Sequence, residues 1–574
     1  MSKILLLFPL FALSLLLGAV PPKDGRVGEP AETATAFFEG RFAGWPGELS
    51  KAQWEQRRKF LRSQILTAAG IDTLTTRPIP RAEIFGRKDY AGFTVEKVLI
   101  ETAPNYWLGA NLFRPSTPPK GKLPAIVSPH GHWASGRLEQ SERGNVPARA
   151  VMLARMGFVV LNYDMVGYND TMQTPHAFGS PAEQLWNWGP MGLQLWNSIR
   201  AVDFLQSLPD VDPARIGATG ASGGATQVFL LAAVDDRIRW SAPVNMISGI
   251  MQGGSPCENG PGLRVDTFNV EIAATMAPRP MLMVAATGDW TRNTPLQEFP
   301  AMKRLYGLYD GESLVESIQI NAPHNYNRAS RESVYDFFAR RAVGLDHGPR
   351  EFDIPAFTKA DLLSLDGRAL PAGSLDYAGV FRQFRESLPA SPSRERLRAA
   401  LLAEWPVKVE ASVSAGAFAL SRTGRGDRVE GRIAGGSRRP VLVIHPEGTA
   451  AAAQDPNVRQ WIAEGRRVLL LEPFRQPPVP EKVRFFLTFQ RSEAANRAQD
   501  ILTVLRWAPG AELYGVGDAA VWAAVAAAMA PNPPKLLGTV ENFSGTDEEW
   551  LKVFPAPGIQ WAGGWRAVQA LQAK

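Results

Sequence analysis

The sequence contains a serine, an aspartate and a histidine in an order that suits nucleophilic catalysis. Ser222 lies in the segment GATGASGG, with Gly220 two residues before it and Gly224 two residues after it. A serine hydroxyl is a weak nucleophile until an imidazole accepts its proton, and a carboxylate must orient that imidazole. Asp289 follows Ser222 in the chain, and His324 follows Asp289. We therefore predict that these three residues form a catalytic triad.

Each of the three residues follows a segment that is predicted to be a strand. These segments are RIGATG before Ser222, PMLMVAATG before Asp289 and SIQIN before His324. In an open parallel sheet, functional residues gather at the carboxyl ends of the strands. Glycines beside the serine leave room for a sharp turn, in which the serine takes a strained backbone conformation. The sequence thus predicts that the three side chains meet at one edge of a sheet.

Each triad residue has an alternative interpretation. Ser222 would otherwise cap the helix that follows it. Asp289 would otherwise be a surface acid, with Glu258 or Glu298 serving as the catalytic carboxylate. His324 has little competition, because no other histidine lies between Ser222 and the end of the last helix predicted in this region.

Backbone amides near the serine are predicted to stabilise a tetrahedral oxyanion. The amide of Gly223, at the start of the helix after Ser222, is one expected donor. The second donor is expected from the loop after the strand PAIVSP, where the amides of Gly131 and His132 are the candidates. Loss of one such donor typically lowers the rate on the order of 100-fold. The side chains of His130 and His132 either take part in function or only shape this loop.

The segments around these residues alternate between strands and helices. Strands that are apolar throughout and separated by helices are typical of a parallel sheet covered on both faces. The pattern predicts a doubly wound, mostly parallel α/β sheet over residues 80–345, after a helical lead over 20–79. Residues 346–407 are richer in proline and polar residues, and we expect a linker with some helix there. The alternating pattern then starts again over 408–574.

The later pattern resembles the earlier one in its spacing. Asp203 precedes Gly220 by 17 residues, and Asp500 precedes Gly517 by the same number. In this register Ala519 takes the place of the serine, and the second copy has no histidine after its turn. We infer a duplication whose second copy is a degenerate α/β domain without the triad. The alternative is that all strand–helix units look alike.

The first residues have the layout of a secretory signal peptide. One lysine precedes an apolar run from Ile4 to Leu17, and the small residues Gly18 and Ala19 follow. The run is shorter than the roughly 20 apolar residues of a membrane-spanning helix. We therefore predict a cleaved signal over residues 1–19 rather than a retained anchor. The mature protein is expected to be periplasmic or extracellular, without stable membrane insertion.

Composition excludes several classes of function. The chain has 574 residues, of which 45% are hydrophobic and 21% charged, as in a globular protein of two domains. The net charge of +6 is spread along the chain without a basic run, so no nucleic-acid partner is expected. Cys257 is the only cysteine, which excludes an intramolecular disulfide. The six histidines show no compact zinc-ligand spacing, and we expect a protein without metal or cofactor.

Five segments resemble the α/β-hydrolase superfamily, and within it the acetyl xylan esterase-like branch of carbohydrate esterases and the related dienelactone-type hydrolases. The segments are PHGH (129–132), YDMVGYNDT (163–171), GASGG (220–224), ATGDWT (286–291) and APHNYN (322–327). The resemblance covers about residues 80–345, and the later domain resembles the same fold in degenerate form. It implies a serine hydrolase that cleaves a small-molecule or polysaccharide ester through an acyl-enzyme on Ser222.

The resemblance leaves the substrate open. Acetyl xylan esterases commonly have glutamine after the nucleophile and glucuronoyl esterases have arginine, whereas this chain has Gly223. Peptidases of the prolyl-oligopeptidase type carry a large β-propeller before the catalytic core, and too few residues precede Pro124 to build one. The alternatives are therefore a glucuronoyl esterase, a serine peptidase, and a non-catalytic binding protein on a hydrolase fold.

The long segment between Asp170 and Gly192 is a candidate for substrate binding. A loop of this length is more often functional than idle, and it contains Trp186 and Trp188. The faces of indole rings stack well against the apolar faces of sugars. We predict that Trp186, Trp188 and Tyr326, which follows the histidine base, bind the substrate. The alternative is that both tryptophans pack in the core.

Overall fold

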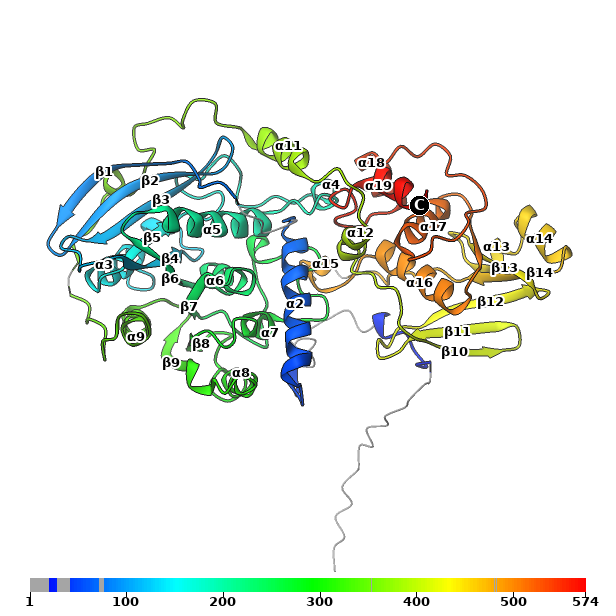
Figure 1. Ribbon diagram of the computed structural model, residues 1–574, viewed down its shortest axis with the longest axis horizontal. Coiled ribbons are helices and arrows are strands. Elements are labelled where there is room, and N and C mark those ends of the chain that lie inside the picture. Colours follow the sequence, from blue (N-terminus) through cyan, green and yellow to red (C-terminus); the bar gives the residue numbers. More distant parts are fainter. Residues whose placement is uncertain are drawn as a thin grey trace, which may run out of the picture.

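The computed structural model describes residues 20–27, 42–71, 77–352, 354–479, 481 and 483–573. The predicted signal peptide, residues 1–19, lies outside the described residues. Two β-sheets lie side by side, and helix α2 (Lys51–Ala68) lies between them (Figure 1). None of the described helices is both long enough and apolar enough to cross a membrane.

The first sheet has nine strands in the order β1-β2-β3-β5-β4-β6-β7-β8-β9. Pairs among β1, β2, β3 and β5 are antiparallel, and all other pairs are parallel. The strands are β1 (Ala82–Tyr90), β2 (Phe93–Ala103), β3 (Tyr106–Pro115), β4 (Leu123–Pro129), β5 (Val159–Tyr163), β6 (Val211–Ala221), β7 (Ile238–Val244), β8 (Met281–Gly288) and β9 (Val315–Pro323).

The order of the strands creates a switch point at the centre of this sheet. The chain passes from β4 to β5 on one side and then returns across β4 to β6 on the other. The loops that leave β4 and β6 therefore diverge at the carboxyl ends of two neighbouring strands, which is where open α/β sheets bind ligands. The strand order thus brings the loop after β4 and the turn after β6 next to each other.

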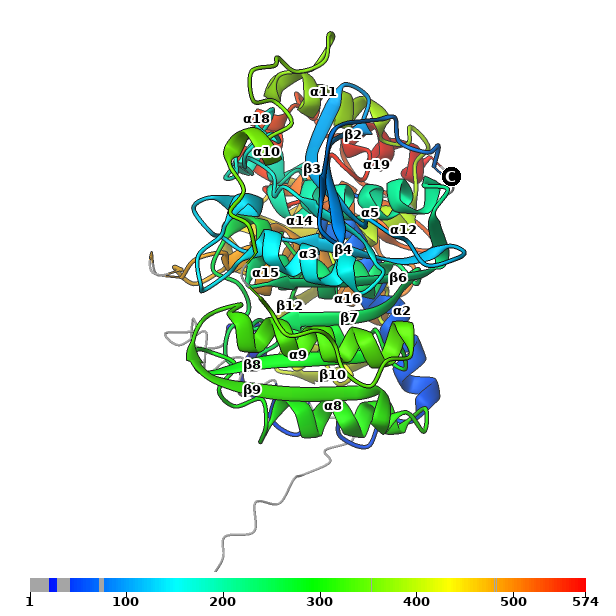
Figure 2. The same ribbon diagram turned by 90° about the vertical axis from the view of Figure 1, so that its left-hand side faces the viewer.

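Helices cover both faces of the sheet, whose central strands are mostly apolar. Every residue of β4 and β5 is buried. Helices α2, α5, α6, α7 and α8 share one hydrophobic cluster with the sheet, and α3 and α9 share the other. Figure 2 shows α3 and α9 on the face turned toward the viewer. The helices are α3 (Val146–Arg155), α4 (Pro181–Gln184), α5 (Pro190–Ser207), α6 (Gly223–Val234), α7 (Asn269–Ala274), α8 (Glu298–Gly307) and α9 (Arg328–Phe338).

The second sheet has six strands in the order β10-β11-β12-β14-β13-β15. This order, and the direction of each pair, repeats the first six strands of the first sheet. The predicted fold class, a doubly wound and mostly parallel α/β sheet with a second α/β domain, is confirmed. The strands are β10 (Val409–Ser414), β11 (Ala417–Arg422), β12 (Val429–Gly435), β13 (Arg438–Ile444), β14 (Arg466–Leu471) and β15 (Glu512–Gly515).

The remaining helices connect the sheets or cover the second one. Those that connect them are α10 (Lys359–Leu362), α11 (Tyr377–Ser387) and α12 (Arg394–Ala400). Those of the second unit are α13 (Thr449–Ala452), α14 (Pro456–Ala463), α15 (Phe486–Phe489), α16 (Glu493–Trp507), α17 (Ala519–Met529), α18 (Asp547–Val553) and α19 (Gly564–Gln572).

The turn between β15 and α17 corrects the expected register of the two copies. Gly517 has a φ of 55° there, and Ser222 in the first copy has a φ of 56°. By backbone conformation, Gly517 rather than Ala519 takes the place of the serine. Among the described residues the second sheet also has no counterparts of β7, β8 and β9. The strands that precede Asp289 and His324 are therefore missing from the second copy.

A buried arginine holds the loops beside the switch point. Arg137 forms ion pairs with Asp164 and Asp170, which follow β5, and all three side chains are fully buried or nearly so. Its Nε donates to Asn111 Oδ1 on β3 at 2.9 Å, and Nη2 donates to the Leu362 carbonyl oxygen at 3.0 Å. One side chain thus connects β3, the loop after β5 and the end of α10.

We expect Arg137→Met to destabilise the protein strongly. The substitution keeps much of the side-chain volume but leaves two buried carboxylates without their cation, which typically costs about 3–5 kcal/mol. The control is Arg350→Met, because the Arg350 side chain is 56% exposed and its pair with Asp336 should contribute less than about 1 kcal/mol. Urea denaturation at neutral pH measures both. Equal free energies of unfolding for the two variants would contradict the prediction.

Candidate active site

Ser222, Asp289 and His324 each follow directly on the last residue of a strand. Ser222 comes after β6, Asp289 after β8 and His324 after β9. Because these strands are parallel and belong to one sheet, all three residues lie at the same edge. The sequence prediction that they follow strands at one sheet edge agrees with this placement.

The backbone at Ser222 is held in a strained conformation. Its φ is 56° and its ψ is −125°, a region in which a residue with a side chain costs about 1–3 kcal/mol. The Ser222 amide donates to the Val244 carbonyl oxygen on β7 at 3.1 Å. An added Cβ at Gly220 would lie 2.7 Å from the Pro129 carbonyl oxygen, and one at Gly224 would lie 2.6 Å from that of His130. Both glycines are therefore required for this turn to pack against the loop after β4.

His324 is oriented by Asp289 through one ring nitrogen. Nδ1 of His324 lies 2.8 Å from Oδ2 of Asp289, whose side chain is only 2% exposed. The other carboxylate oxygen of Asp289 accepts from the Thr291 amide at 2.7 Å and from the Thr291 hydroxyl at 2.5 Å. Nε2 of His324 is buried and has no hydrogen-bond partner among the described residues. With Nδ1–H donated to the carboxylate, Nε2 is left as the proton acceptor.

Neither alternative acid pairs with His324. Glu258 accepts from the amides of Gly254 and Ser255 and from the hydroxyl of Thr226. Glu298 accepts from the amide of Gly249 at 2.8 Å. Of the carboxylates considered from the sequence, Asp289 is thus the one that contacts the imidazole.

One aromatic and one cationic side chain that the sequence analysis did not single out also contact His324. The indole of Trp290 packs against the imidazole with ring centroids 4.4 Å apart and an interplanar angle of 38°, and its Nε1 donates to the Asn245 carbonyl oxygen at 3.0 Å. The guanidinium of Arg143 donates to the His324 carbonyl oxygen at 3.0 Å. Trp290 lies in the segment ATGDWT, so its position next to Asp289 was a signal in the sequence. Arg143 comes from a distant loop and gave none.

The predicted oxyanion donors surround Ser222. Gly223 is the first residue of α6, and amides in the first turn of a helix have no partner within the helix. An added Cβ at Gly131 would lie 3.4 Å from the Ser222 Cβ, so this loop packs directly against the serine. An added Cβ at Gly223 would lie 2.4 Å from Cε1 of His132. The imidazole of His132 therefore fills the space that a side chain at position 223 would need.

His130 has a structural role in the same loop. Its Nδ1–H donates to the Gly131 carbonyl oxygen at 2.7 Å, and its Nε2 accepts from the Met165 amide at 2.9 Å. Burial lowers the pKa of His130 to about 3. The ring is thus neutral at physiological pH, and both nitrogens are used to join the loop after β4 to the loop after β5.

The three residues predicted to bind the substrate, Trp186, Trp188 and Tyr326, contact other parts of the protein instead. Tyr326 is fully buried, and its hydroxyl lies 2.7 Å from that of Thr219 inside the sheet. Trp188 is 4% exposed and packs on Phe384 of α11 with ring centroids 4.8 Å apart. Trp186 is half-buried, and its Nε1 donates to the carboxylate of Asp547 on α18 at 3.1 Å.

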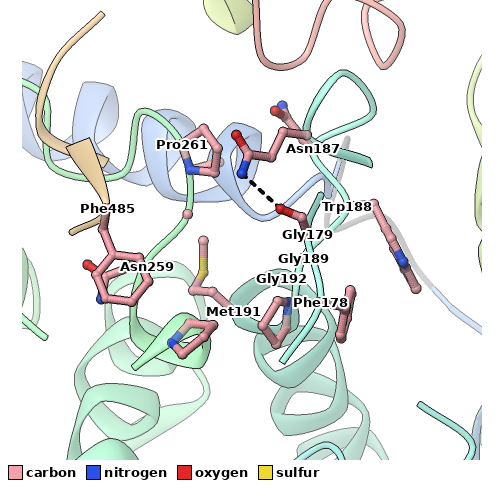
Figure 3. A pocket seen from close by; sticks show the side chains of 15 residues that line it. Phe178, Gly179, Asn187, Trp188, Gly189, Met191, Gly192, Asn259, Pro261 and Phe485 are labelled. Atoms are coloured by element: carbon pink, nitrogen blue, oxygen red, sulfur yellow. Dashed lines mark hydrogen bonds between the residues drawn. The ribbon is translucent and has the colours of Figure 1, made fainter. Parts of the chain in front are cut away.

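These positions correct the prediction, because the rings that were expected to face a sugar are used for packing. Figure 3 shows Trp188 beside a cavity that is also lined by Phe178, Met191 and Phe485. The Gln184 side chain, which also lines this cavity, donates to the Gly179 carbonyl oxygen at 2.9 Å. This cavity measures about 140 Å³, and Trp188 also lines a second cavity of about 660 Å³ together with Trp196 and Phe384. The burial of Trp188 and the contacts of both indole rings favour packing, the alternative noted for the two tryptophans.

One group of side chains in the described part of the chain has the donor atoms for a metal ion. His132, His176 and Cys257 each offer one ligand atom, and these atoms lie within 4.8 Å of one another. His132 belongs to the loop after β4, His176 to the loop after β5, and Cys257 to the short helix η3 (Pro256–Glu258). The group adjoins the site, since His132 lies against Gly223.

We expect the neutral state of His130 to make the protein less stable in acid. In the unfolded chain this residue binds a proton below about pH 6.5, and in the folded chain only below about pH 3. The unfolded state therefore binds more protons between these values, and the free energy of unfolding falls as the pH falls, by up to about 1.4 kcal/mol per pH unit. His130→Gln removes the titrating group but keeps an amide donor and acceptor.

Urea denaturation at about pH 6.5 and pH 5 measures the effect. Over this range the loss of stability should be about 2 kcal/mol smaller in His130→Gln than in the wild type, because all other titrating groups are shared. The same pH slope in both proteins would contradict the assignment.

Several known proteins match part of this chain. No family model matches the chain. The chain is 26% identical over 218 residues to YtaP of Bacillus subtilis (strain 168), a protein named as a hydrolase, and the match covers 35% of this chain and 72% of YtaP. Among solved structures it is similar to methylesterase BT1017, with 34% identity over 53% of this chain and 68% of that one and a TM-score of 0.47.

Two further solved structures are more distant. A glucuronoyl esterase from Solibacter usitatus is 15% identical, with a TM-score of 0.39, and the match covers 50% of this chain and 93% of that one. An acetyl xylan esterase from Paenibacillus sp. R4 is 16% identical, with a TM-score of 0.35, and the match covers 53% and 98%.

Proposed function

We propose that this chain, which belongs to the α/β-hydrolase superfamily, is a serine esterase that cleaves a carboxylic ester of a carbohydrate. The observation that carries the proposal is the state of the His324 ring. One nitrogen is held by the buried carboxylate of Asp289, and the other is buried and unpartnered at the edge where Ser222 lies. A non-catalytic binding protein has no need of this arrangement.

In the proposed mechanism, Nε2 of His324 accepts the proton of the Ser222 hydroxyl as the oxygen attacks the ester carbonyl. Asp289 keeps the proton on Nδ1 and stabilises the imidazolium that forms. The amides of Gly223 and of the loop at Gly131 and His132 donate to the oxyanion. His324 then protonates the leaving alcohol, and a water molecule activated by the same imidazole releases the acyl group from Ser222.

The hydrogen bonds from Thr291 support this role of Asp289. Two hydrogen bonds to one oxygen hold the carboxylate in place, so that its other oxygen stays directed at the imidazole. The strained turn at Ser222 supports the role of the serine, because such strain is kept where it exposes a nucleophile on a strand-to-helix turn.

A carbohydrate ester is favoured by what similar proteins act on and by one aromatic ring. The similar structures are named as a methylesterase, a glucuronoyl esterase and an acetyl xylan esterase. Trp133 is half-buried, and its Nε1 would lie 3.3 Å from a Cβ at Gly131, next to the predicted oxyanion donors. We propose that Trp133, rather than Trp186 or Trp188, offers its face to a sugar ring. We also propose export, on the layout of residues 1–19.

We expect Ser222→Ala to abolish hydrolysis of p-nitrophenyl acetate. Removal of a triad nucleophile lowers kcat by about 10⁴-fold or more, because only the oxyanion donors and binding remain. The control is Ser207→Ala, since Ser207 is an exposed residue at the end of α5 whose hydroxyl only bonds the Phe204 carbonyl oxygen. This variant should keep the wild-type rate. Equal turnover by the wild type and Ser222→Ala would rule out the serine mechanism.

A panel of acetylated xylan, methyl-esterified pectin, a methyl glucuronate ester and a proline-containing peptide tests the substrate class. We expect kcat/KM on at least one carbohydrate ester to exceed that on p-nitrophenyl acetate at least about 10-fold, since remote binding energy from the sugar contributes to catalysis. Release of acetate or of methanol identifies the ester. Cleavage of the peptide without cleavage of any carbohydrate ester would favour the peptidase alternative.

A further inference from the structure

We propose that His132, His176 and Cys257 form a binding site for a divalent transition-metal ion, Zn²⁺ or a close analogue, next to the candidate active site. Their ligand atoms lie within 4.8 Å of one another, although the residues come from three separate loops. The two imidazoles are half-buried and the thiol is buried. In a cluster on the surface, mobile side chains can meet by chance. Here the fold itself brings the three ligand atoms together.

The contact between His132 and Cys257 is the centre of the cluster. Nε2 of His132 lies 3.1 Å from Sγ of Cys257. The Ser255 hydroxyl lies 3.6 Å from the same sulfur and 3.5 Å from Nε2 of His176. Cys257 is the only cysteine of the chain, so its thiol has no disulfide partner. Neither the proposed catalytic mechanism nor the packing of the sheet uses this thiol.

His176 is oriented as a metal ligand usually is. Its Nδ1–H donates to the Val166 carbonyl oxygen at 2.7 Å, which leaves the lone pair of Nε2 directed away from the backbone. Histidines that bind metals almost always donate their second nitrogen in this way, because the bond fixes the tautomer and the ring plane. The ring also packs edge-to-face on Tyr168 and on His132, with centroids 5.0 and 5.2 Å away.

The donor set selects the class of ion. Two imidazole nitrogens and one sulfur suit Zn²⁺ and Co²⁺ and do not suit Ca²⁺ or Mg²⁺, which prefer oxygen ligands. Three protein ligands leave a fourth position for water or for another oxygen donor. Binding forms a bond between the metal and Sγ of Cys257 and releases the thiol proton to the solvent.

A bound ion would stabilise the part of the site that holds the oxyanion donors. His132 provides a ring nitrogen to the ion and lies in van der Waals contact with Gly223, while its own amide is one of the predicted donors. The ion would therefore connect the loop after β4 to η3 and to the loop after β5. This role does not depend on Ser222, so metal binding and esterase activity can be tested separately.

Titration of the metal-free full-length protein with Co²⁺ tests the proposal. We expect one equivalent to bind and to give a near-ultraviolet charge-transfer band, which requires a thiolate ligand. Cys257→Ser should lose the band, and His176→Gln should bind at least about 10-fold more weakly. His347→Gln is the matched control, because His347 is exposed and lies outside the cluster, and it should behave as the wild type does. Circular dichroism shows whether each variant is folded.

The possible results distinguish failure of the metal site from failure of the proposed esterase function. The proposal would be overturned if the wild-type spectrum lacked the thiolate band, or if the wild type retained neither Co²⁺ nor Zn²⁺ after gel filtration. Both measurements use the wild type, so they remain valid even where a variant fails to fold. Ser222→Ala should bind Co²⁺ as the wild type does while it lacks esterase activity. Metal binding by a protein that shows no esterase activity at all would keep this site and overturn only the proposed function.

Discussion

The close approach of two backbone segments at the centre of the first sheet determines the rest of the site. The turn around Ser222 packs against the loop after β4 so tightly that neither Gly220 nor Gly224 has room for a Cβ. The approach follows from the strand order, which makes β4 and β6 neighbours. It also keeps Ser222 strained, because the chain must turn into α6 within one residue. The serine hydroxyl and the amides of both segments are thereby fixed to one another before any substrate binds.

The sequence was sufficient to predict those parts of the site that depend on local order along the chain. A carboxylate or imidazole that directly follows an apolar strand is placed at the sheet edge by the strand itself, and this rule predicted the positions of Asp289 and His324 after β8 and β9. The rule could not assign Trp186 and Trp188, since an indole packs in a core as well as it stacks on a sugar. The choice between packing and sugar binding depends on the residues that each indole contacts. These residues belong to α11 and α18, which lie far along the chain.

The same limit applies to two other expectations from the sequence. Equal spacing of 17 residues in the two copies suggested that Ala519 replaces the serine, whereas the backbone assigns that place to Gly517. Spacing counts residues but does not record where a turn begins. Likewise, the expectation of a metal-free protein used ligand spacing along the chain. His132, His176 and Cys257 are far apart there, and only the loops of the folded sheet bring their donor atoms together.

Among the described residues, the second unit repeats the strands around the switch point but has no counterparts of the strands that precede Asp289 and His324. Its six strands repeat the order of β1 to β6. Together with the helices of this unit they bury a hydrophobic core of their own. It is joined to the first unit by buried polar contacts as well as apolar ones. Trp561 donates to the Gly70 carbonyl oxygen at 3.0 Å, and the amides of Gly558 and Gln560 donate to the carbonyl oxygens of Gln184 and Leu185. These contacts fix the segment that contains Trp186 and Trp188, and the same loop after β5 also carries His176. The His176 ring packs on His132, which lies against Gly223, so the second unit restrains a loop that borders the candidate active site.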